Sequence, residues 1–351
     1  MIERRGQEKA RVLMLVPYRS QQRGNVLTAE RIFQGLSGRG WSMQRLFLED
    51  DHGMEELQAG MAVRKYQMIH GFHALHVARA LHAEPRLRDI PLLLTTTGTD
   101  IHYGLSGPES RQVLSALHMS RFIVIFNPHF EALIEKYYPG VAEKLVVIPQ
   151  GVWLPSSEPT SRENLGLEKE HMVFLLPSGL RSVKNIELAL EGLSLLRKTH
   201  PRMSLLILGA VLDEDYGNRI LNRIRELDWV RYLGEVAHNQ VKSVYALADV
   251  VINCSLAEGQ PQAALEAMSL GKPALLSSVP GNQGIMEDGI QGFYFRSAPE
   301  LAIKAGLLAD SLERRRMMGQ AAILLVREKY ELERELQAYE SLYKVWGHTF
   351  P

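Results

Sequence analysis

The segment from Ala257 to Gly271, A-E-G-Q-P-Q-A-A-L-E-A-M-S-L-G, carries two carboxylates, Glu258 and Glu266, eight residues apart. It follows the apolar run D-V-V-I-N-C at Asp249–Cys254. A short continuous apolar run before a loop is typical of a buried strand. We therefore expect Glu258 in the loop at the carboxyl end of a strand and Glu266 about one turn inside the next helix.

Pro261 fits the first turn of that helix, where its missing N–H would have no partner, and Gly271 fits its C-terminal stop. Helix side chains lean toward the N-terminus, so we expect both carboxylates to face one crevice, with the free N–H groups of the helix start between them. Carboxylates accept hydrogen bonds from hydroxyls and a helix N-terminus attracts phosphate, which suits a sugar joined to a nucleotide diphosphate. The residues expected to line this site are Gly259, Gln260, Gln262, Ala263 and Glu266.

The composition favours a soluble protein of two domains. The chain has 351 residues, which is longer than a chain with a single hydrophobic core usually is. Its hydrophobic content of 46% is unlike that of a disordered chain. Lys plus Arg and Asp plus Glu both number 40, so no net charge attracts nucleic acid. Cys254 is the one cysteine, which excludes an internal disulfide. With no secretory signal or spanning run in the sequence, we expect a cytoplasmic location, with peripheral membrane contact left open.

Short apolar runs alternate with amphipathic helical stretches along nearly the whole chain. Continuous Val, Ile and Leu runs indicate strands covered on both faces, which predicts parallel sheets and the α/β class. The polar, Pro-containing segment 152–167 predicts a linker between two doubly wound halves, and residues 312–346 have a helical pattern. The strands are expected in Arg11–Tyr18, Tyr66–Gly71, Pro91–Thr97, Phe122–Asn127, Leu145–Pro149, Met172–Pro177, Ser204–Gly209, Val230–Leu233, Asp249–Cys254, Pro273–Ser277 and Gly292–Phe295.

Ligands of open α/β sheets bind beyond the carboxyl ends of the strands, which predicts a cleft between the halves. In the first half, Gly24 and Asn25 precede a helix, where backbone can approach a phosphate; a turn glycine and an Asn cap are the alternative. Asp100 follows a run that ends in threonines. We expect it at the cleft rim as an acceptor-binding residue or base, with helix capping as the alternative.

In the second half, the run Met172–Pro177 leads into S-G-L-R-S-V-K-N, in which Arg181 and Lys184 are three residues apart. At the start of a helix these two cations would project from one face and hold a diphosphate. Gly179 fits the same crevice. A solvated basic helix face is the alternative.

Three further patterns are less specific indicators of a binding site: a pair of histidines, an Asp-x-Asp and a turn that contains a glycine. His73 and His76 lie at a strand-to-helix junction without a carboxylate, which favours a structural role over a metal site. Asp213 and Asp215 form an Asp-x-Asp, which an acidic first helix turn explains more simply than a metal. The Y-L-G-E-V segment that ends in Val236 could read the edge of a base through its backbone.

Together these motifs resemble glycosyltransferases of the GT-B fold, in particular retaining family 4 (glycosyltransferase group 1). The G-N-x-x-T-A-x-R at Gly24–Arg31 and the G-T-D at Gly98–Asp100 look more like an offshoot with the glycosyltransferase-1-domain proteins of animals and the bacterial selenosugar synthases. The other motifs that carry the resemblance are I-P-Q-G-V, G-L-R-S-V-K-N, L-I-L-G-A, Y-L-G-E-V, E-G-Q-P-Q-A-A-L-E, G-K-P-A-L-L-S-S-V-P-G-N and D-G-I-Q-G-F-Y-F.

The resemblance implies an acceptor domain at 1–152, a donor domain at 168–330 and a helix at 331–351 that returns to the first domain. It also implies that Glu266 holds the ribose hydroxyls, Glu258 a hydroxyl of the donor sugar, and Arg181 and Lys184 the diphosphate. Gly24 would close from the first domain, and the backbone near Val236 would read the base. No metal or other cofactor is expected.

The expected activity is glycosyl transfer from a UDP-sugar, with UDP-N-acetylglucosamine as one candidate, to a small-molecule, glycan or lipid acceptor that the sequence does not identify. Gln260–Pro261 and Thr99–Asp100 depart from the family pattern, which leaves the acceptor and the stereochemical outcome open. The alternatives are a catalytically silent nucleotide-sugar-binding subunit and a sugar-nucleotide epimerase of the same fold. A pyridine-nucleotide oxidoreductase is disfavoured because no G-x-G-x-x-G follows a strand. Nothing in the sequence indicates an oligomeric state.

Overall fold

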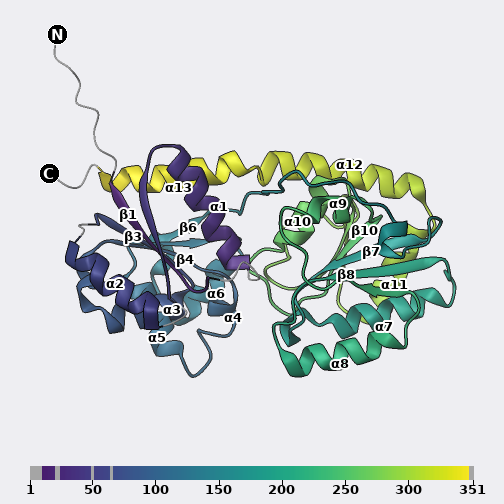
Figure 1. Ribbon diagram of the computed structural model, residues 1–351, viewed down its shortest axis with the longest axis horizontal. Coiled ribbons are helices and arrows are strands. Elements are labelled where there is room, and N and C mark those ends of the chain that lie inside the picture. The colour runs from purple at the N-terminus through teal and green to yellow at the C-terminus, as the bar shows by residue number, and fades with distance from the viewer. Residues whose placement is uncertain (1–9, 20–23, 49–50, 64–65, 348–351) are drawn as a thin grey trace, which may run out of the picture. The chain divides into compact units, whose positions relative to one another are not determined.

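The computed structural model describes residues 10–19, 24–48, 51–63 and 66–347. The chain divides into two compact units, the first formed by residues 1–150 with 333–351 and the second by residues 151–332. Each unit contains a six-stranded, fully parallel sheet with helices on both faces, as the ribbon diagram shows (Figure 1).

The sheet of the first unit has the order β2-β1-β3-β4-β5-β6. Five of its strands lie within one residue of the predicted apolar runs. The strand Ser42–Phe47 was not predicted, because it is an edge strand with one neighbour and its sequence, S-M-Q-R-L-F, mixes polar with apolar residues. The strands are β1 Arg11–Val16, β2 Ser42–Phe47, β3 Met68–Phe72, β4 Leu92–Thr95, β5 Phe122–Ile125 and β6 Leu145–Val147.

Helices cover both faces of this sheet. The helices α3, α5 and α6 pack on one face, while α1 and α13 pack against each other, where Leu336 fills the space beside Gly35. The buried Arg31 of α1 joins Glu335 of α13 through two charge-assisted bonds of 2.7 and 2.8 Å. The helices are α1 Gly24–Gly38, α2 Asp51–Val63, α3 Ala74–Ala83, α4 Thr99–His102, α5 Ser110–Met119, α6 Phe130–Tyr137 and α13 Leu332–Gly347, with 3-10 turns η1 Pro85–Asp89 and η2 Val141–Lys144.

The sheet of the second unit has the order β12-β11-β10-β7-β8-β9, so the strand order reverses between β7 and β10. All six strands lie within one residue of the predicted runs. They are β7 Met172–Pro177, β8 Met203–Leu208, β9 Val230–Tyr232, β10 Val250–Asn253, β11 Ala274–Ser277 and β12 Gly292–Phe295.

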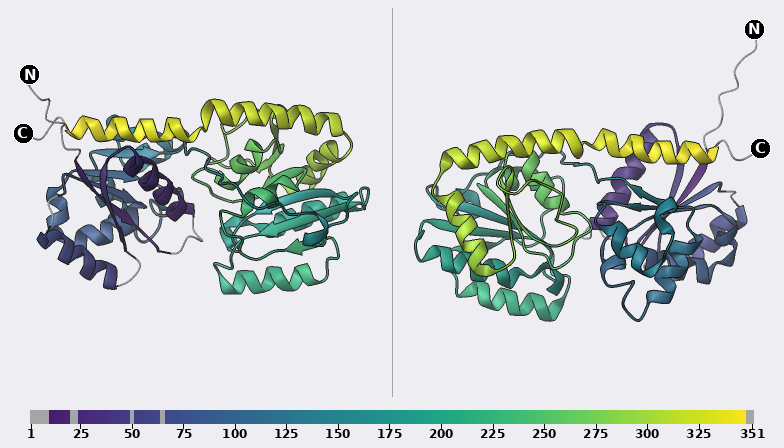
Figure 2. Two further views of the ribbon diagram at one scale, coloured as in Figure 1. Left: turned by 45° about the horizontal axis from the view of Figure 1, so that its top comes forward. Right: turned by 180° about the vertical axis from the view of Figure 1, so that it is seen from behind.

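Alternate residues of these strands serve two cores. Phe174 and Leu205 face α7, α8 and α11, while Val173 and Leu206 face α9, α10 and α12. Figures 1 and 2 show the two helix layers on opposite sides of the sheet. The helices are α7 Ile186–Arg197, α8 Glu214–Arg225, α9 Val241–Ala246, α10 Gln262–Ser269, α11 Ala298–Ala309 and α12 Leu312–Lys329, with 3-10 turns η3 Glu163–Leu165 and η4 Ser182–Lys184.

The predicted linker 152–167 packs on the second unit. The Arg162 guanidinium donates to the carbonyl oxygens of Leu247, Lys169 and His171 and forms an ion pair of 2.9 Å with Asp249. The segment is thus fixed to the start of β10. The prediction of two doubly wound α/β halves is confirmed by the two parallel sheets. Within the residues that the structure describes, no helix has the length and apolarity needed to cross a membrane.

The buried His70 predicts a pH dependence of stability. Its ring contacts the Tyr343 hydroxyl at 2.7 Å and the Thr95 hydroxyl at 2.8 Å, and burial lowers its pKa to about 3. In the unfolded chain the His70 ring binds a proton as the pH falls below about 6.5, whereas in the folded chain it stays neutral at these pH values. Stability is therefore lost as the pH falls below 6.5, by about 2 kcal/mol between pH 7 and pH 5. Denaturant titrations at pH 7 and pH 5 measure the free energy of unfolding. The unsubstituted chain should show this loss, and His70→Gln should not.

Candidate functional site

The reversal of strand order in the second unit marks its candidate site. From β7 the chain continues to β8 on one side, and from β10 it continues to β11 on the other, so the loops after β7 and β10 diverge. A crevice between such loops, at the carboxyl ends of the strands, is the usual ligand site of open α/β sheets. The loop after β7 carries Gly179, Arg181 and Lys184, and the loop after β10 carries Glu258.

Glu258 and Lys184 meet at this point. The Lys184 Nζ lies 2.6 Å from Glu258 Oε1, and the two side chains are 18% and 10% exposed. The same carboxylate oxygen accepts hydrogen bonds of 2.6 Å from the Ser255 hydroxyl and 2.9 Å from the Asn253 amide. The structure thus joins two predicted site residues that are 74 positions apart in the chain.

The carboxyl of Glu258 stays ionised in this environment. Burial alone would raise its pKa, but the charge of Lys184 and the hydrogen bonds from Lys184, Ser255 and Asn253 outweigh burial. The pKa of Glu258 is therefore below its usual value. An ionised carboxylate accepts hydrogen bonds only, so it can bind hydroxyl groups of a ligand.

A second layer of contacts fixes the Glu258 loop. The Asn253 side-chain oxygen accepts hydrogen bonds of 3.1 Å from the Ser255 N–H and from the amide of buried Asn282. The backbone of Gly281 lies so close to the Glu258 carbonyl that a Cβ at Gly281 would overlap it. Asn253, Ser255 and Asn282 were not among the residues predicted from the sequence. The polar Asn253 at the end of an apolar strand is the signal that could have found them.

The expected helix start at Arg181 and Lys184 was wrong. These residues lie at a 3-10 turn, η4, and α7 begins only at Ile186. Asn185 lies between η4 and α7 and has a left-handed backbone, with φ 48°. The two cations therefore do not share a face of α7. Lys184 pairs with Glu258, and Arg181 is half-buried at the start of the same turn.

Glu266 lies one turn inside α10, as predicted, and is 6% exposed. Its carboxylate is 3.4 Å from His238 Nε2, and the His238 ring lies 5.2 Å from the Trp153 ring. Burial first, and then the charge and hydrogen bond of Glu266, raise the pKa of Tyr245 well above its usual value. His238, Trp153 and Tyr245 were not predicted from the sequence, because no spacing rule connects them to Glu266.

The start of α10 is one residue later than predicted, because Pro261 occupies the N-cap. The Gln262 amide donates to the Gly151 carbonyl at 2.8 Å and accepts from the Gln260 amide at 3.2 Å. Gly259 and Gln260 are buried and Ala263 is half-buried. Gly271 ends the helix in the left-handed conformation, as predicted.

The other predicted residues of this unit lie in neighbouring loops. A Cβ at Gly179 would meet Leu212, so this position needs glycine for packing. Val236 is half-buried and follows the left-handed Gly234. Asp213 accepts a hydrogen bond from the Tyr216 N–H and caps α8, which is the simpler alternative for the Asp-x-Asp.

In the first unit, Gly24 and Asn25 are the first residues of α1, so Asn25 is inside the helix and does not cap it. Residues 20–23, which precede them in the chain, are outside the described residues. Asp100 is 2% exposed, and its two oxygens accept from the backbone N–H groups of Ala74 and Thr97 at 2.8 and 2.9 Å. Asp100 thus holds the starts of α3 and α4.

Potential metal ligands do not gather in the part of the chain that the structure describes. Within it, no group of three or more His, Cys, Asp or Glu side chains could hold an ion. His73 precedes α3, and His76 contacts the Tyr18 hydroxyl at 3.1 Å.

Known proteins resemble this chain in both sequence and fold. Residues 157–324 match the family model "Glycosyl transferases group 1". A Xenopus tropicalis protein named "Glycosyltransferase 1 domain-containing protein 1" is 28% identical over 261 residues, 72% of this chain and 76% of that protein. The alpha-monoglucosyldiacylglycerol synthase of Acholeplasma laidlawii is 24% identical over 271 residues, 74% and 66% of the two chains. The match to this family model therefore lies within the second unit.

Solved structures give the fold. A sucrose-phosphate synthase from Thermosynechococcus elongatus superposes with a TM-score of 0.79 at 18% identity, over 96% of this chain and 98% of that one. The Anabaena protein HepE, solved in complex with UDP-glucose, gives a TM-score of 0.77 at 18% identity, over 95% and 100%. The fold is GT-B, and the resemblance to group 1 glycosyltransferases is confirmed.

The close approach at Gly281 gives a prediction for stability. Gly281→Ala places a methyl group against the Glu258 carbonyl, so we expect a loss of about 1–3 kcal/mol from overpacking. Gly306→Ala, inside α11, is the matched control, because its Cβ would have ordinary contact at 3.5 Å with Leu196. Helix propensity predicts a gain of about 0.5–1 kcal/mol for that control. Denaturant unfolding of the two variants checks both signs, and equal effects would contradict the close packing.

Proposed function

We propose that this chain transfers a glycosyl group from a nucleotide diphosphate sugar, with UDP as the nucleotide, to an acceptor nucleophile. The observation that carries the proposal is the Lys184–Glu258 pair at the strand-order reversal of the second unit, in which the glycosyltransferase group 1 model matches. A cation suited to phosphate lies there beside an ionised carboxylate suited to sugar hydroxyls. The complex of HepE with UDP-glucose, which has the same fold, supports the choice of UDP.

The proposal divides the donor between the predicted residues. Glu258 accepts a hydrogen bond from a hydroxyl of the donor sugar, and Glu266 accepts from the ribose. Glu266 is held next to His238, which keeps its carboxylate in one orientation. The backbone near Val236 reads the base, and the N–H groups at the start of α10 face the phosphates. From the first unit, Gly24 and Asn25 at the start of α1 approach the diphosphate.

The chemical step breaks the bond between C1 of the sugar and the diphosphate oxygen. The bonding electron pair leaves with the nucleotide diphosphate while positive charge develops on the sugar, and the acceptor supplies the electron pair of the new bond to C1 and loses its proton. Lys184 and Arg181 stabilise the negative charge of the leaving group, the type of electrostatic contribution that is usually largest in enzymes. In this proposal neither glutamate acts as a nucleophile.

Glu258→Gln tests the proposed role of the carboxylate. The amide keeps the shape but cannot pair with Lys184, so we expect transfer from a UDP-sugar to fall by about 100-fold or more. Glu226→Gln, an exposed change at the end of α8, is the matched control. Steady-state transfer assays, together with circular dichroism to verify folding, measure the effect. Near-normal activity in folded Glu258→Gln would reject this role.

Thermal unfolding with nucleotides tests the donor class. At about 100 times its dissociation constant, a ligand stabilises the folded chain by about 2.7 kcal/mol. We expect UDP and UDP-sugars to raise the melting temperature, equally with and without a chelator, and NAD to have no effect.

The same panel separates the alternatives. Stabilisation by a UDP-sugar with neither transfer nor hydrolysis indicates a silent binding subunit, and turnover of the donor without any acceptor indicates an epimerase. A response to NAD alone, or to a divalent metal alone, would contradict the proposed donor.

A further inference from the structure

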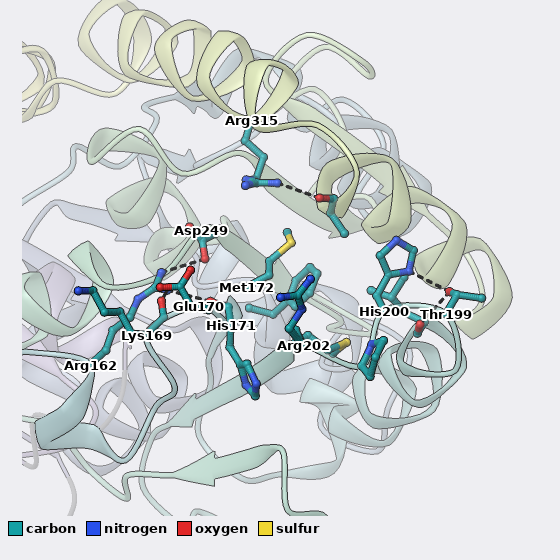
Figure 3. A pocket seen from close by; sticks show the side chains of 15 residues that line it. Arg162, Lys169, Glu170, His171, Met172, Thr199, His200, Arg202, Asp249 and Arg315 are labelled. Atoms are coloured by element: carbon teal, nitrogen blue, oxygen red, sulfur yellow. Dashed lines mark hydrogen bonds and ion pairs between the residues drawn. The ribbon is translucent and has the colours of Figure 1, made fainter.

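A second polar hollow lies at the opposite end of the same sheet. It has a volume of about 530 Å³ and opens at the amino ends of β7 and β8, where Met172 and Met203 begin the two strands (Figure 3). The loops of Lys184 and Glu258 follow the carboxyl ends of β7 and β10. The hollow is therefore separate from the candidate site. The charged and histidine side chains that line it are Arg162, Lys169, Glu170, His171, His200, Arg202, Asp249 and Arg315.

One ion pair in this hollow is part of the fold. Asp249 pairs with Arg162 at 2.9 Å and also accepts a 2.8 Å hydrogen bond from the Val173 N–H. The guanidinium of Arg162 is otherwise occupied by three backbone carbonyl oxygens. These two charges cancel and hold the linker segment to β10, so neither is available for a ligand.

Two arginines remain. Within the described residues, the Arg202 side chain has neither a hydrogen bond nor an ion pair. Arg315 uses one terminal nitrogen to bind the Leu308 and Ala309 carbonyls at the end of α11, and its other nitrogens have no partner within those residues. Figure 3 shows Arg315 entering from α12 and Arg202 from the segment before β8, with the Met172 side chain between them in this view.

The remaining lining charges do not neutralise these arginines. His200 pairs with Asp310 at 2.9 Å, outside the lining, and Glu170 lies beside Lys169, away from Arg202 and Arg315 in Figure 3. The excess of positive charge is thus concentrated on the two guanidinium groups. Arg315 is half-buried and Arg202 is exposed.

We propose that this hollow is a second ligand site, which binds the phosphate group of a small molecule between Arg202 and Arg315. A guanidinium presents several N–H donors in a fixed plane that matches phosphate oxygens, and two of them suit a dianion. The volume of 530 Å³ is within the range of small-molecule sites, so there is room for the organic part of the ligand beside the histidine rings. The inference does not depend on the proposed transferase activity.

Titration of the full chain with inorganic phosphate, followed by 31P NMR at constant ionic strength, tests the site. We expect saturable binding whose dissociation constant rises at least ~10-fold in Arg202→Gln, because a hydrogen bond to a charged group is lost. Arg315→Gln should act alike, but it also loses the contacts to α11. Arg202→Gln removes no contact within the described residues, so it keeps the test decisive if Arg315→Gln fails to fold.

Arg316→Gln is the matched control, since it removes the same charge from the next, exposed residue, which does not line the hollow. Phosphate binding should be unchanged in Arg316→Gln. Binding that is unaffected by Arg202→Gln, or equally weakened by Arg316→Gln, overturns the site.

Two further arms identify the source of the phosphate. Sugar phosphates that bind in solution and protect the chain from thermal unfolding indicate a soluble ligand. Sedimentation with phosphatidylglycerol vesicles but not phosphatidylcholine vesicles, abolished by Arg202→Gln, indicates a lipid headgroup. Failure of inorganic phosphate, sugar phosphates and anionic vesicles to bind would reject the inference.

Discussion

The second unit depends on keeping the carboxylate of Glu258 ionised in a mostly buried position. A buried charge without a partner costs several kcal/mol, so Glu258 requires a cation within contact distance. Lys184 meets this need at 2.6 Å, and it can do so only because β7 and β10 are neighbours in the sheet. The order of the parallel strands thus places the two charges of the candidate site.

The surroundings of this pair explain why it stays in one arrangement. Ser255 and Asn253 donate to the same carboxylate oxygen, and Asn282 connects Asn253 to the end of β11. Each of these side chains belongs to a strand end or to the tight turn after it, which is more rigid than a long loop. A cation and a carboxylate held this way can bind the two chemically different parts of one donor, its phosphates and its sugar hydroxyls.

The structural features that could be predicted from the sequence are those with a local physical signal. Strands buried on both faces are apolar throughout and were found, whereas the edge strand β2 has one neighbour, mixed polarity and no such signal. Lys184 was assigned to the right loop, but no pattern reveals that Asn185 adopts a left-handed backbone and delays the helix. The contact between Lys184 and Glu258 spans 74 residues and follows from the strand order, which a single sequence does not contain. Asn253, a polar residue at the end of an apolar strand, was visible and was not used.

The central claim is that Lys184 and Glu258 act on the donor as one unit. A double-mutant cycle of kcat/KM for transfer from a UDP-sugar, with Lys184→Met, Glu258→Gln and the combined variant, measures this directly. If the pair acts as a unit, the combined variant should be no slower than the slower single variant. Losses that simply add would mean that the two residues act independently, and the account would be contradicted.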